Sequence, residues 1–212
     1  MLERFRQFWT KLLAPIAHFL LKIGVKPDHV TIVGTAGVVF GALFFFPRGE
    51  LFWGVMFITA FVFSDLIDGY MARTSGQSSK WGAFLDSTLD RVGDAAIFGG
   101  LAVYYVSAHA EADLGEVRWY FYLSLACLVL GNLTSYARAR AESLGMQAKG
   151  GIAERADRLV AILVTTGFNG LLDLPVLTEI TLWALAVASL VTVFQRMATV
   201  RRQAVANPTP DA

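Results

Sequence analysis

Charged residues are scarce in this chain of 212 residues, at 17% against about 25% in typical soluble domains. Hydrophobic residues make up 55% of the sequence, and the mean hydropathy is +0.53. A soluble globule of this length cannot bury so much apolar surface, and the same numbers exclude intrinsic disorder and a collagen-like repeat. The composition therefore predicts an integral membrane protein.

Cysteine, histidine and net charge are scarce as well. The single cysteine, Cys127, excludes both a disulfide framework and a cysteine-based metal site within one chain. The three histidines are scattered, so the chain has no metal motif of the HExxH type. The net charge is only +1, which provides no bulk field for nucleic acid, and no nucleic-acid partner is expected.

Six long apolar stretches predict six membrane-spanning helices, because a helix needs about 20 apolar residues to cross a bilayer. The expected spans are Val30–Phe46, Leu51–Ala72, Trp81–Ser107, Trp119–Ala141, Ala153–Leu172 and Leu177–Ala198. The expected fold class is therefore all-α and polytopic, with one six-helix transmembrane domain over residues 27–200. The remaining residues, 201–212, are expected to form a disordered cytoplasmic tail.

A juxtamembrane segment, residues 1–26, precedes the first expected span. Its apolar residues recur at helical spacing, whereas Arg4, Lys11 and Lys22 occupy other angles. A basic amphipathic helix of this kind lies flat in the headgroup layer and has membrane lipids as its partners. Packing of the helix against protein is the alternative.

The basic residues indicate how the chain is oriented. With the N-terminus in the cytoplasm, all but two of the 18 lysine and arginine residues fall on the cytoplasmic side. The two exceptions are Arg48 and Arg118. Because cytoplasmic loops are enriched in basic residues, we expect a multi-pass protein of the cell membrane with both termini in the cytoplasm.

Acidic residues inside membrane spans are costly and point to function. Four of them occupy the end of the second expected span and the start of the third: Asp65, Asp68, Asp86 and Asp90. Within each pair the spacing is three or four residues, so the two carboxylates share one face of their helix. The polar loop between the spans is short, which makes the helices antiparallel neighbours and brings all four acids together at the cytoplasmic face.

Four carboxylates in one place repel one another unless cations lie between them. Oxygen ligands select hard ions, so the cluster predicts Mg²⁺ or Mn²⁺, and four acids on two helices suit two ions better than one. Interhelical ion pairs with Arg73 and Arg91 are the structural alternative. Asp94 extends the stripe by one more turn, and we expect it to be structural or to support the ligands rather than to bind metal.

The same residues belong to a longer pattern. Asp65-x2-Asp68-Gly69-x2-Ala72-Arg73-x8-Gly82-x3-Asp86-x3-Asp90 resembles the signature of the CDP-alcohol phosphotransferases, with every position at the expected spacing. The resemblance implies transfer of a substituted phosphoryl group from a CDP-linked donor to an alcohol, with release of CMP. It also implies a homodimer, while the distribution of basic residues predicts that the active site faces the cytoplasm.

The resemblance assigns roles to individual residues. Asp65, Asp68, Asp86 and Asp90 would bind two divalent metal ions, and Asp90 would also be the general base that takes the proton of the acceptor hydroxyl. The donor, CDP-diacylglycerol, would be bordered by Pro27, Asp28, Thr31, Gly69, Ala72, Arg73 and Gly82. The small residues in this set leave room for a phosphate or allow close helix packing, and the sequence does not choose between these roles.

The acceptor is implied by a looser similarity. The stretches 81–91, 135–143 and 151–158 are similar to the phosphatidylinositol phosphate synthases of actinobacteria, a branch of the family that uses inositol 1-phosphate. A phosphorylated polyol needs cations beside the metal site, and Arg138, Arg155 and Arg196 at cytoplasmic helix ends are the candidates. The alternatives are that these arginines only set topology, and that the pocket takes glycerol 3-phosphate.

Two other classes of membrane protein also place acids inside the membrane. In a UbiA-like prenyltransferase the two acidic clusters lie far apart in the chain, whereas here one short loop separates them. An ion transporter places its site near the middle of the membrane in broken helices, whereas these acids lie at one face. The sequence therefore favours a metal-dependent phosphatidyl transferase.

Overall fold

A computed structural model of the chain describes residues 14–76, 79–107, 114–152 and 154–206, with the backbone alone at residues 65 and 114–118. These residues form helices joined by turns and short loops, without a strand. The helices are α2 (Pro27–Phe45), η1 (Phe46–Arg48), α3 (Leu51–Val62), α4 (Ser64–Thr74), α5 (Lys80–Ser107), α6 (Leu114–Ser143), α7 (Arg155–Leu172) and α8 (Pro175–Ala206). The all-α expectation is therefore confirmed for the described part of the chain.

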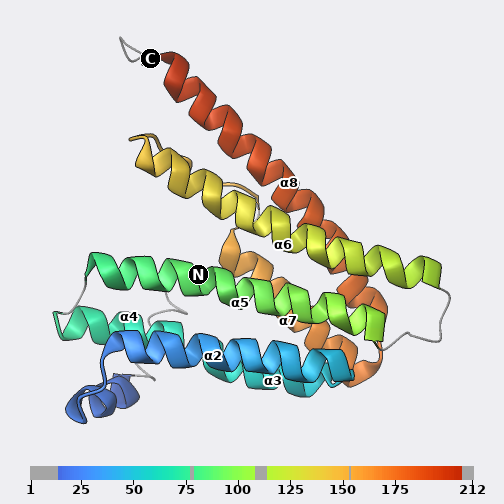
Figure 1. Cartoon of the computed structure of the whole chain (residues 1–212), viewed down its shortest axis with the longest axis horizontal. Coiled ribbons are helices and arrows are strands. Elements are labelled where there is room, and N and C mark those ends of the chain that lie inside the picture. The colour runs from blue at the N-terminus through green and yellow to red at the C-terminus, as the bar shows by residue number, and fades with distance from the viewer. Residues whose placement is uncertain (1–13, 77–78, 108–113, 153, 207–212) are drawn as a thin grey trace.

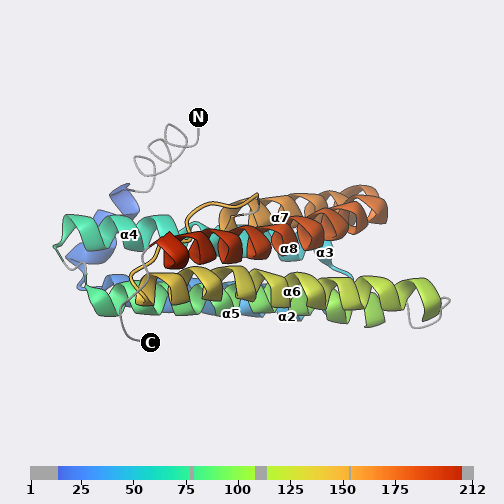
Figure 2. The same ribbon diagram turned by 90° about the horizontal axis from the view of Figure 1, so that it is seen from above.

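The long helices form a bundle of two layers (Figures 1 and 2). Helices α2, α5 and α6 form one layer, and α3, α4, α7 and α8 form the other (Figure 2). The packing closes into a ring, since α2 contacts α5, α5 contacts α6, α6 contacts α8, α8 contacts α7, α7 contacts α3, and α3 contacts α2. Each helix therefore buries one face and leaves its opposite face outside.

The outward faces of the bundle are apolar. Trp119 on α6 is 65% exposed, and Trp53 and Trp183 are also exposed. The interior is filled by side chains such as Phe46, Phe98 and Leu182. A bundle that is apolar on both its inner and outer surfaces is stable in a lipid environment rather than in water.

Glycines on α2 allow the second layer to approach closely. Gly34, Gly37 and Gly41 lie on one face of α2, and a Cβ atom at any of them would overlap a side chain of α3 or α4. At Gly34 the overlap would be with the hydroxyl of Ser64, and at Gly37 with the ring of Phe61. This is the small-residue packing that membrane helices use in place of a hydrophobic driving force.

The second expected span is interrupted. The sequence predicts one helix over Leu51–Ala72, whereas the structure has α3 ending at Val62 and α4 beginning at Ser64. Phe63 lies between them and donates its N–H to the carbonyl of Phe61, which is not an α-helical hydrogen bond. The interruption falls where Ser64 packs against the bare Cα of Gly34, and it separates the apolar α3 from the acid-bearing α4.

Among the residues that the structure describes, four helical segments are long and apolar enough to cross a membrane: Pro27–Arg48, Leu51–Thr74, Trp119–Ser143 and Pro175–Ala206. Helices α5 and α7 do not meet that criterion, because charged residues occupy the first turns of each. Both nevertheless pack inside the same bundle, between helices that do meet it. The polytopic membrane architecture is therefore supported, whereas the count of six spans stays a prediction.

The C-terminal part of the chain differs from the sequence expectations at two boundaries. The last helix was expected to end at Ala198, yet α8 continues to Ala206. The expected disordered tail therefore does not begin at residue 201, and residues 207–212 lie outside the described part. Residues 201–206 have no helix breaker among them, so the backbone ladder of α8 simply continues.

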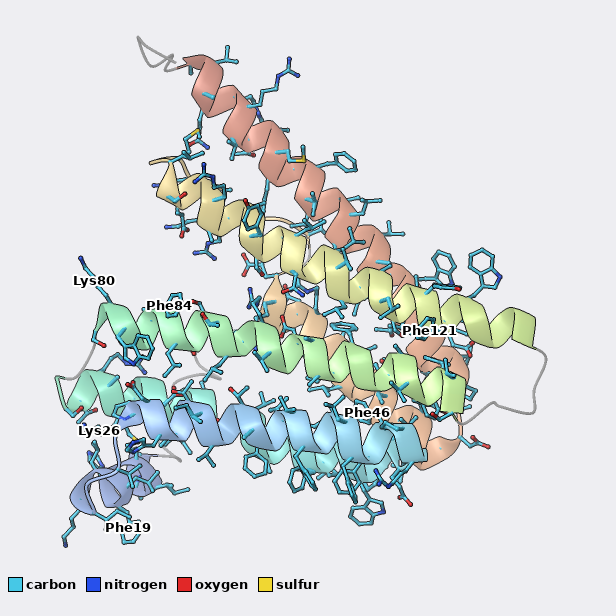
Figure 3. All side chains as sticks on the ribbon, viewed as in Figure 1. Phe19, Lys26, Phe46, Lys80, Phe84 and Phe121 are labelled. Atoms are coloured by element: carbon cyan, nitrogen blue, oxygen red, sulfur yellow. The ribbon has the colours of Figure 1, made fainter. Side chains whose placement is uncertain are left out.

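Part of the juxtamembrane segment is described. Residues 14–22 are helical, and the helix contacts α4 through the His18 and Tyr70 rings, whose centroids lie 5.6 Å apart. Ala17 is buried, whereas Ile16, Phe19 and Ile23 are exposed (Phe19 is labelled in Figure 3). The expected interfacial helix over residues 1–26 stays a prediction, and its residues 1–13 lie outside the described part.

Candidate active site

Three helix termini meet at one end of the bundle. Helix α2 begins at Pro27, α4 ends at Thr74 and α5 begins at Lys80. Lys26 and Lys80 mark this end in Figure 3, while Phe46 and Phe121 lie toward the other. Helix α2 packs against both α4 and α5 here. The residues that the sequence assigns to donor and metal binding all lie on these three elements.

The carboxylate of Asp68 is held by the first turn of α2. Asp68 is buried on α4, and its Oδ2 accepts a hydrogen bond of 2.5 Å from the Thr31 hydroxyl. The same hydroxyl lies 3.2 Å from the carbonyl of Pro27, one turn earlier on α2. Thr31, which the sequence assigns to the donor site, therefore orients a predicted metal ligand.

Asp28 and Gly82 join α2 to α5. The indole Nε1 of Trp81 donates to Asp28 Oδ2 at 3.1 Å. Ser79 caps the start of α5, since its hydroxyl accepts the N–H of Gly82 at 3.0 Å. A Cβ at Gly82 would lie 3.7 Å from Asp28 Oδ1, so a larger side chain would project between the two helices.

The other expected donor residues lie on α4. The Arg73 guanidinium folds back over Gly69, where its Nη1 would lie 3.3 Å from an added Cβ. Ala72 is half-buried one residue before Arg73. The structure thus brings all seven expected donor residues to the α2, α4 and α5 termini, and their roles in donor binding stay a prediction.

The described carboxylates fit a divalent cation by their charge and chemistry. Asp86 and Asp90 on α5 are near enough to Asp68 to repel its negative charge. Within the described part of the chain, neither Asp68 nor Asp86 has an ion-pair partner. Uncompensated oxygen ligands of this kind suit Mg²⁺ or Mn²⁺.

The carboxylates whose side chains the structure describes are not, however, drawn together around one point. Among the side chains that the structure describes, no three carboxylate, imidazole or thiol groups gather closely enough to surround one ion. The side chain of Asp65 lies outside that description. The assignment of Asp65, Asp68, Asp86 and Asp90 as metal ligands therefore stays a prediction.

A polar cavity of about 760 Å³ opens beside these acids. Its walls come from α5, α6, α7, the residue before α7, and α8, and they carry both signs of charge. The charged lining residues are Asp86, Asp90, Arg91, Arg138, Glu142, Glu154, Arg155, Arg158 and Arg196. The three arginines that the sequence nominates thus line a single cavity that also contains the predicted general base.

Arg155 is ion-paired with two acids of α5. Its Nη1 lies 2.8 Å from Asp90 Oδ1, and its Nε lies 3.0 Å from Asp94 Oδ1. Arg91 lies beside the same two carboxylates, at 3.5 Å from Asp90 and 3.9 Å from Asp94. Asp90 thus has an interhelical ion pair, although its partner is Arg155 of α7 rather than the Arg73 or Arg91 that the sequence suggested, and Arg91 pairs with it within α5. Asp94 takes part in ion pairs with the same arginines.

Arg196 and Arg158 converge on Thr134 of α6. Arg196 donates to the main-chain carbonyl of Thr134 and, at 3.1 Å, to that of Gly150. Arg158 donates to the Thr134 hydroxyl at 2.8 Å. Arg196 lies ten residues before the end of α8 and is buried, so it is not at a helix end as the sequence predicted.

Arg138 has a different environment from the other arginines. Its side chain is 48% exposed, and its Nε lies 3.0 Å from Glu142 Oε1, one turn along α6. Sequence reasoning missed Arg158, which lines the cavity and is 3% exposed. Its position three residues after Arg155 places both on one face of α7 and was the available signal.

Comparison with known proteins identifies the family. The profile described as CDP-alcohol phosphatidyltransferase matches residues 25–194, which include every helix from α2 to α7 and most of α8.

The chain belongs to the CDP-alcohol phosphatidyltransferase family.

Relatives within this family share close similarity with the chain. A phosphatidylinositol phosphate synthase of Streptomyces avermitilis is 53% identical over 204 residues, covering 93% of this chain and 81% of the relative. The enzyme of the same name from Cutibacterium acnes is 48% identical and covers 95% and 98%. The chain therefore aligns with these relatives over nearly its whole length.

Solved structures of this CDP-alcohol phosphatidyltransferase family share the fold. Mycobacterium tuberculosis phosphatidylinositol phosphate synthase with CDP-DAG bound has a TM-score of 0.82 at 40% identity, covering 90% of this chain and 94% of that one. The same enzyme with manganese and citrate has a TM-score of 0.81 at 41% identity, covering 88% of both chains. Relatives of this chain thus bind a CDP-linked lipid and a divalent metal.

Proposed function

We propose that this protein is a phosphatidylinositol phosphate synthase. It transfers the phosphatidyl group of CDP-diacylglycerol to a hydroxyl of inositol 1-phosphate and releases CMP. The observation that carries this proposal is the cavity in which Asp86 and Asp90 of α5 face Arg138, Arg155 and Arg196. A phosphorylated alcohol needs both arginine and carboxylate side chains in its site. Its phosphate binds guanidinium groups, and its reacting hydroxyl must give its proton to a base.

The donor occupies the end of the bundle where α2, α4 and α5 meet. Gly69, Ala72 and Gly82 leave the space for the diphosphate, and Arg73 lies over Gly69 where it meets phosphate oxygens. Asp28, held by the Trp81 indole, and Pro27 form the opposite wall. The apolar outer faces of the same helices extend from this site into the lipid, where the acyl chains remain.

The metal ligands are Asp65, Asp68, Asp86 and Asp90, and they hold two Mg²⁺ or Mn²⁺ ions. The bound ions neutralise charge that develops on the diphosphate as CMP leaves. Thr31 fixes the Asp68 carboxylate through its hydroxyl, so a ligand oxygen is oriented before any ion arrives. The manganese bound by the Mycobacterium tuberculosis relative supports this use of the acids.

The acceptor phosphate binds Arg155, Arg196 and Arg138 in the cavity. Arg155 lies between the base and the phosphate, since its Nη1 contacts Asp90 at 2.8 Å. Asp90 then takes the proton from the acceptor hydroxyl as the oxygen attacks the donor phosphorus. The bond from that phosphorus to the CMP oxygen breaks, and CMP departs with the electron pair.

The remaining features concern the membrane and the assembly. Helices α5 and α7 also cross the bilayer, which gives six spans, and the acid-bearing end faces the cytoplasm of the cell. The N-terminal segment lies on the membrane surface through Ile16, Phe19 and Ile23. The distribution of basic residues supports this orientation, whereas assembly as a homodimer rests on the family resemblance alone.

An acceptor screen tests the proposed function. Purified protein receives CDP-diacylglycerol and Mg²⁺ or Mn²⁺ with inositol 1-phosphate, glycerol 3-phosphate, inositol or serine. We expect CMP release and phosphatidylinositol phosphate by mass spectrometry with the first acceptor, and no turnover in EDTA. Faster turnover of glycerol 3-phosphate would make the protein a phosphatidylglycerophosphate synthase. If CMP is not released with any of these four acceptors, the proposal is overturned.

A further inference from the structure

A buried acid lies behind the arginines of the acceptor cavity. Asp94 on α5 is 5% exposed and does not line the cavity itself. Its Oδ1 accepts the Nε–H of Arg155 at 3.0 Å. Its Oδ2 lies 3.8 Å from Nη2 of Arg158 and 3.9 Å from Nε of Arg91. One carboxylate therefore faces three guanidinium groups, all of which do line the cavity.

The contact to Arg155 is independent of the contact that Arg155 makes with Asp90. Asp94 holds the Nε atom, whereas Asp90 holds Nη1 at 2.8 Å. If Asp90 turns to a metal ion or to the acceptor hydroxyl, the hold of Asp94 on Nε is unchanged. Arg155 then keeps its place on the cavity wall, held by Asp94 at Nε.

The same acid also fixes the next turn of α7. Arg158 is almost fully buried between Asp94 and the Thr134 hydroxyl, and Thr134 accepts Arg196 through its carbonyl. A chain of contacts thus runs from α5 through α7 and α6 to α8. Without Asp94, three buried or half-buried guanidinium groups would lose a shared negative partner and repel one another.

We propose that Asp94 is a positioning residue for the acceptor phosphate site. It sets the direction of the Arg155 side chain, and through Arg158 and Thr134 it sets that of Arg196. This inference rests on the proposed function, because it concerns how the phosphorylated acceptor is held. Asp94 lies outside the lining of the cavity, so its effect on the reaction passes through the arginines.

Steady-state kinetics of Asp94→Asn test the proposal. Asparagine keeps the size of the side chain and one oxygen but removes the charge. We expect the KM for inositol 1-phosphate to rise on the order of tenfold, because hydrogen bonds to charged partners are the stronger ones. The KM for CDP-diacylglycerol should stay within about twofold of the wild-type value, which is small beside the expected tenfold change in the acceptor KM. Asp94→Glu, which restores the charge one methylene further out, should recover part of the loss.

Asp157→Asn is the matched control. Asp157 lies on α7 between Arg155 and Arg158 in sequence, but it is exposed and outside the cavity. It loses the same charge near the same arginines, so it should leave both KM values unchanged. Equal changes in Asp94→Asn and Asp157→Asn would overturn the proposal, since bulk charge rather than position would then explain the effect.

Thermal unfolding separates positioning from folding. Inositol 1-phosphate should raise the Tm of the wild type and of Asp157→Asn, and it should raise that of Asp94→Asn much less. CDP should raise all three equally. A lower Tm for Asp94→Asn with both ligand shifts intact would show that Asp94 only stabilises the fold and would overturn the proposal. If glycerol 3-phosphate proves to be the acceptor, the proposed function fails, yet the same split should appear with that ligand.

Discussion

At the scale of single residues, the arginines of the cavity differ in what anchors them. Arg155 is held by carboxylates, Arg158 by a carboxylate and a hydroxyl, and Arg196 by main-chain carbonyls. Each of these acceptors uses a particular nitrogen of the guanidinium fork. A lysine offers one point charge at the end of a flexible stem, so it cannot reproduce these contacts together with a phosphate.

Replacing Arg155 with Ala should weaken the acceptor selectively. The lost charge-assisted contact is worth about 1.5–3 kcal/mol, which corresponds to a rise in acceptor KM of roughly tenfold to a hundredfold. The KM for CDP-diacylglycerol should change little, because the proposed donor site lies where α2, α4 and the start of α5 meet. Arg140→Ala, an exposed arginine of α6 outside the cavity, is the control and should behave as the wild type. An unchanged acceptor KM in Arg155→Ala would remove the phosphate pocket.

Replacing Thr31 with Val should weaken metal binding. Valine has the shape of threonine but leaves the buried Asp68 carboxylate without its hydroxyl donor. Loss of a group that orients a metal ligand typically lowers metal affinity by about 10–100-fold. The Mn²⁺ concentration that gives half-maximal activity should therefore rise by at least about tenfold. Thr35→Val, one turn along α2, should show the wild-type metal requirement. Identical metal titrations for the two variants would argue against Asp68 as a ligand.

At the scale of helices, the bundle depends on a few close approaches. Gly100 of α5 faces α2, where an added Cβ would lie 2.6 Å from the main-chain oxygen of Ala42. That oxygen belongs to a rigid helix, so it cannot move without shifting α2 as a whole. The adjacent Gly99 has nothing within 4 Å of the same added atom. The structure thus has no room for a side chain at Gly100, whereas it has room for one at the neighbouring Gly99.

Alanine at these two positions should give opposite results. Gly100→Ala should destabilise the protein by about 1–3 kcal/mol, the usual cost of overpacking. Gly99→Ala should be neutral or should stabilise it by up to about 1 kcal/mol, since alanine is the better helix former. Thermal unfolding in detergent measures both. Equal Tm values for the two variants would contradict the α2–α5 contact described above.

At the scale of the whole molecule, the helix order places the loops at two ends. The α4–α5 and α6–α7 connections lie at the end with the acids, and the α2–α3 and α7–α8 connections lie at the other end (Figure 1). In the sequence, most of the lysine and arginine residues lie near the end of α4, the start of α5, the end of α6, the start of α7 and the end of α8. Both facts are consistent with a catalytic end in the cytoplasm.

Cysteine labelling tests this orientation. In a Cys127→Ser background, Glu50→Cys and Leu174→Cys should react with an impermeant maleimide in intact cells. Ser75→Cys and Lys149→Cys should react only after the membrane is permeabilised. All four positions are exposed in the structure, so accessibility depends on the side of the membrane alone. The reverse pattern would place the catalytic end outside and would contradict the proposed localisation.

The sequence by itself determined the fold class, the approximate helices and the identity of the acids. Hydropathy and helical spacing are local properties, so Asp65 and Asp68, or Asp86 and Asp90, share a face wherever their helices pack. The eight-position signature is likewise local, because one short loop separates its two halves. The nomination of Arg138, Arg155 and Arg196 came from their expected depth in the membrane, and the structure places all three in one cavity.

Only the tertiary structure decided which groups meet across helices. Asp94 and Arg155 are 61 residues apart, and Arg196 and Thr134 are 62 apart. The interruption at Phe63 occurs where Ser64 packs on Gly34 of another helix, although the stretch around it reads as one apolar span. Periodicity shows which residues share a face of one helix. Which neighbour that face meets is set by the rotation and packing of all the helices together, and this is why the contacts of Asp94 with Arg155 and Arg158 emerged only from the fold.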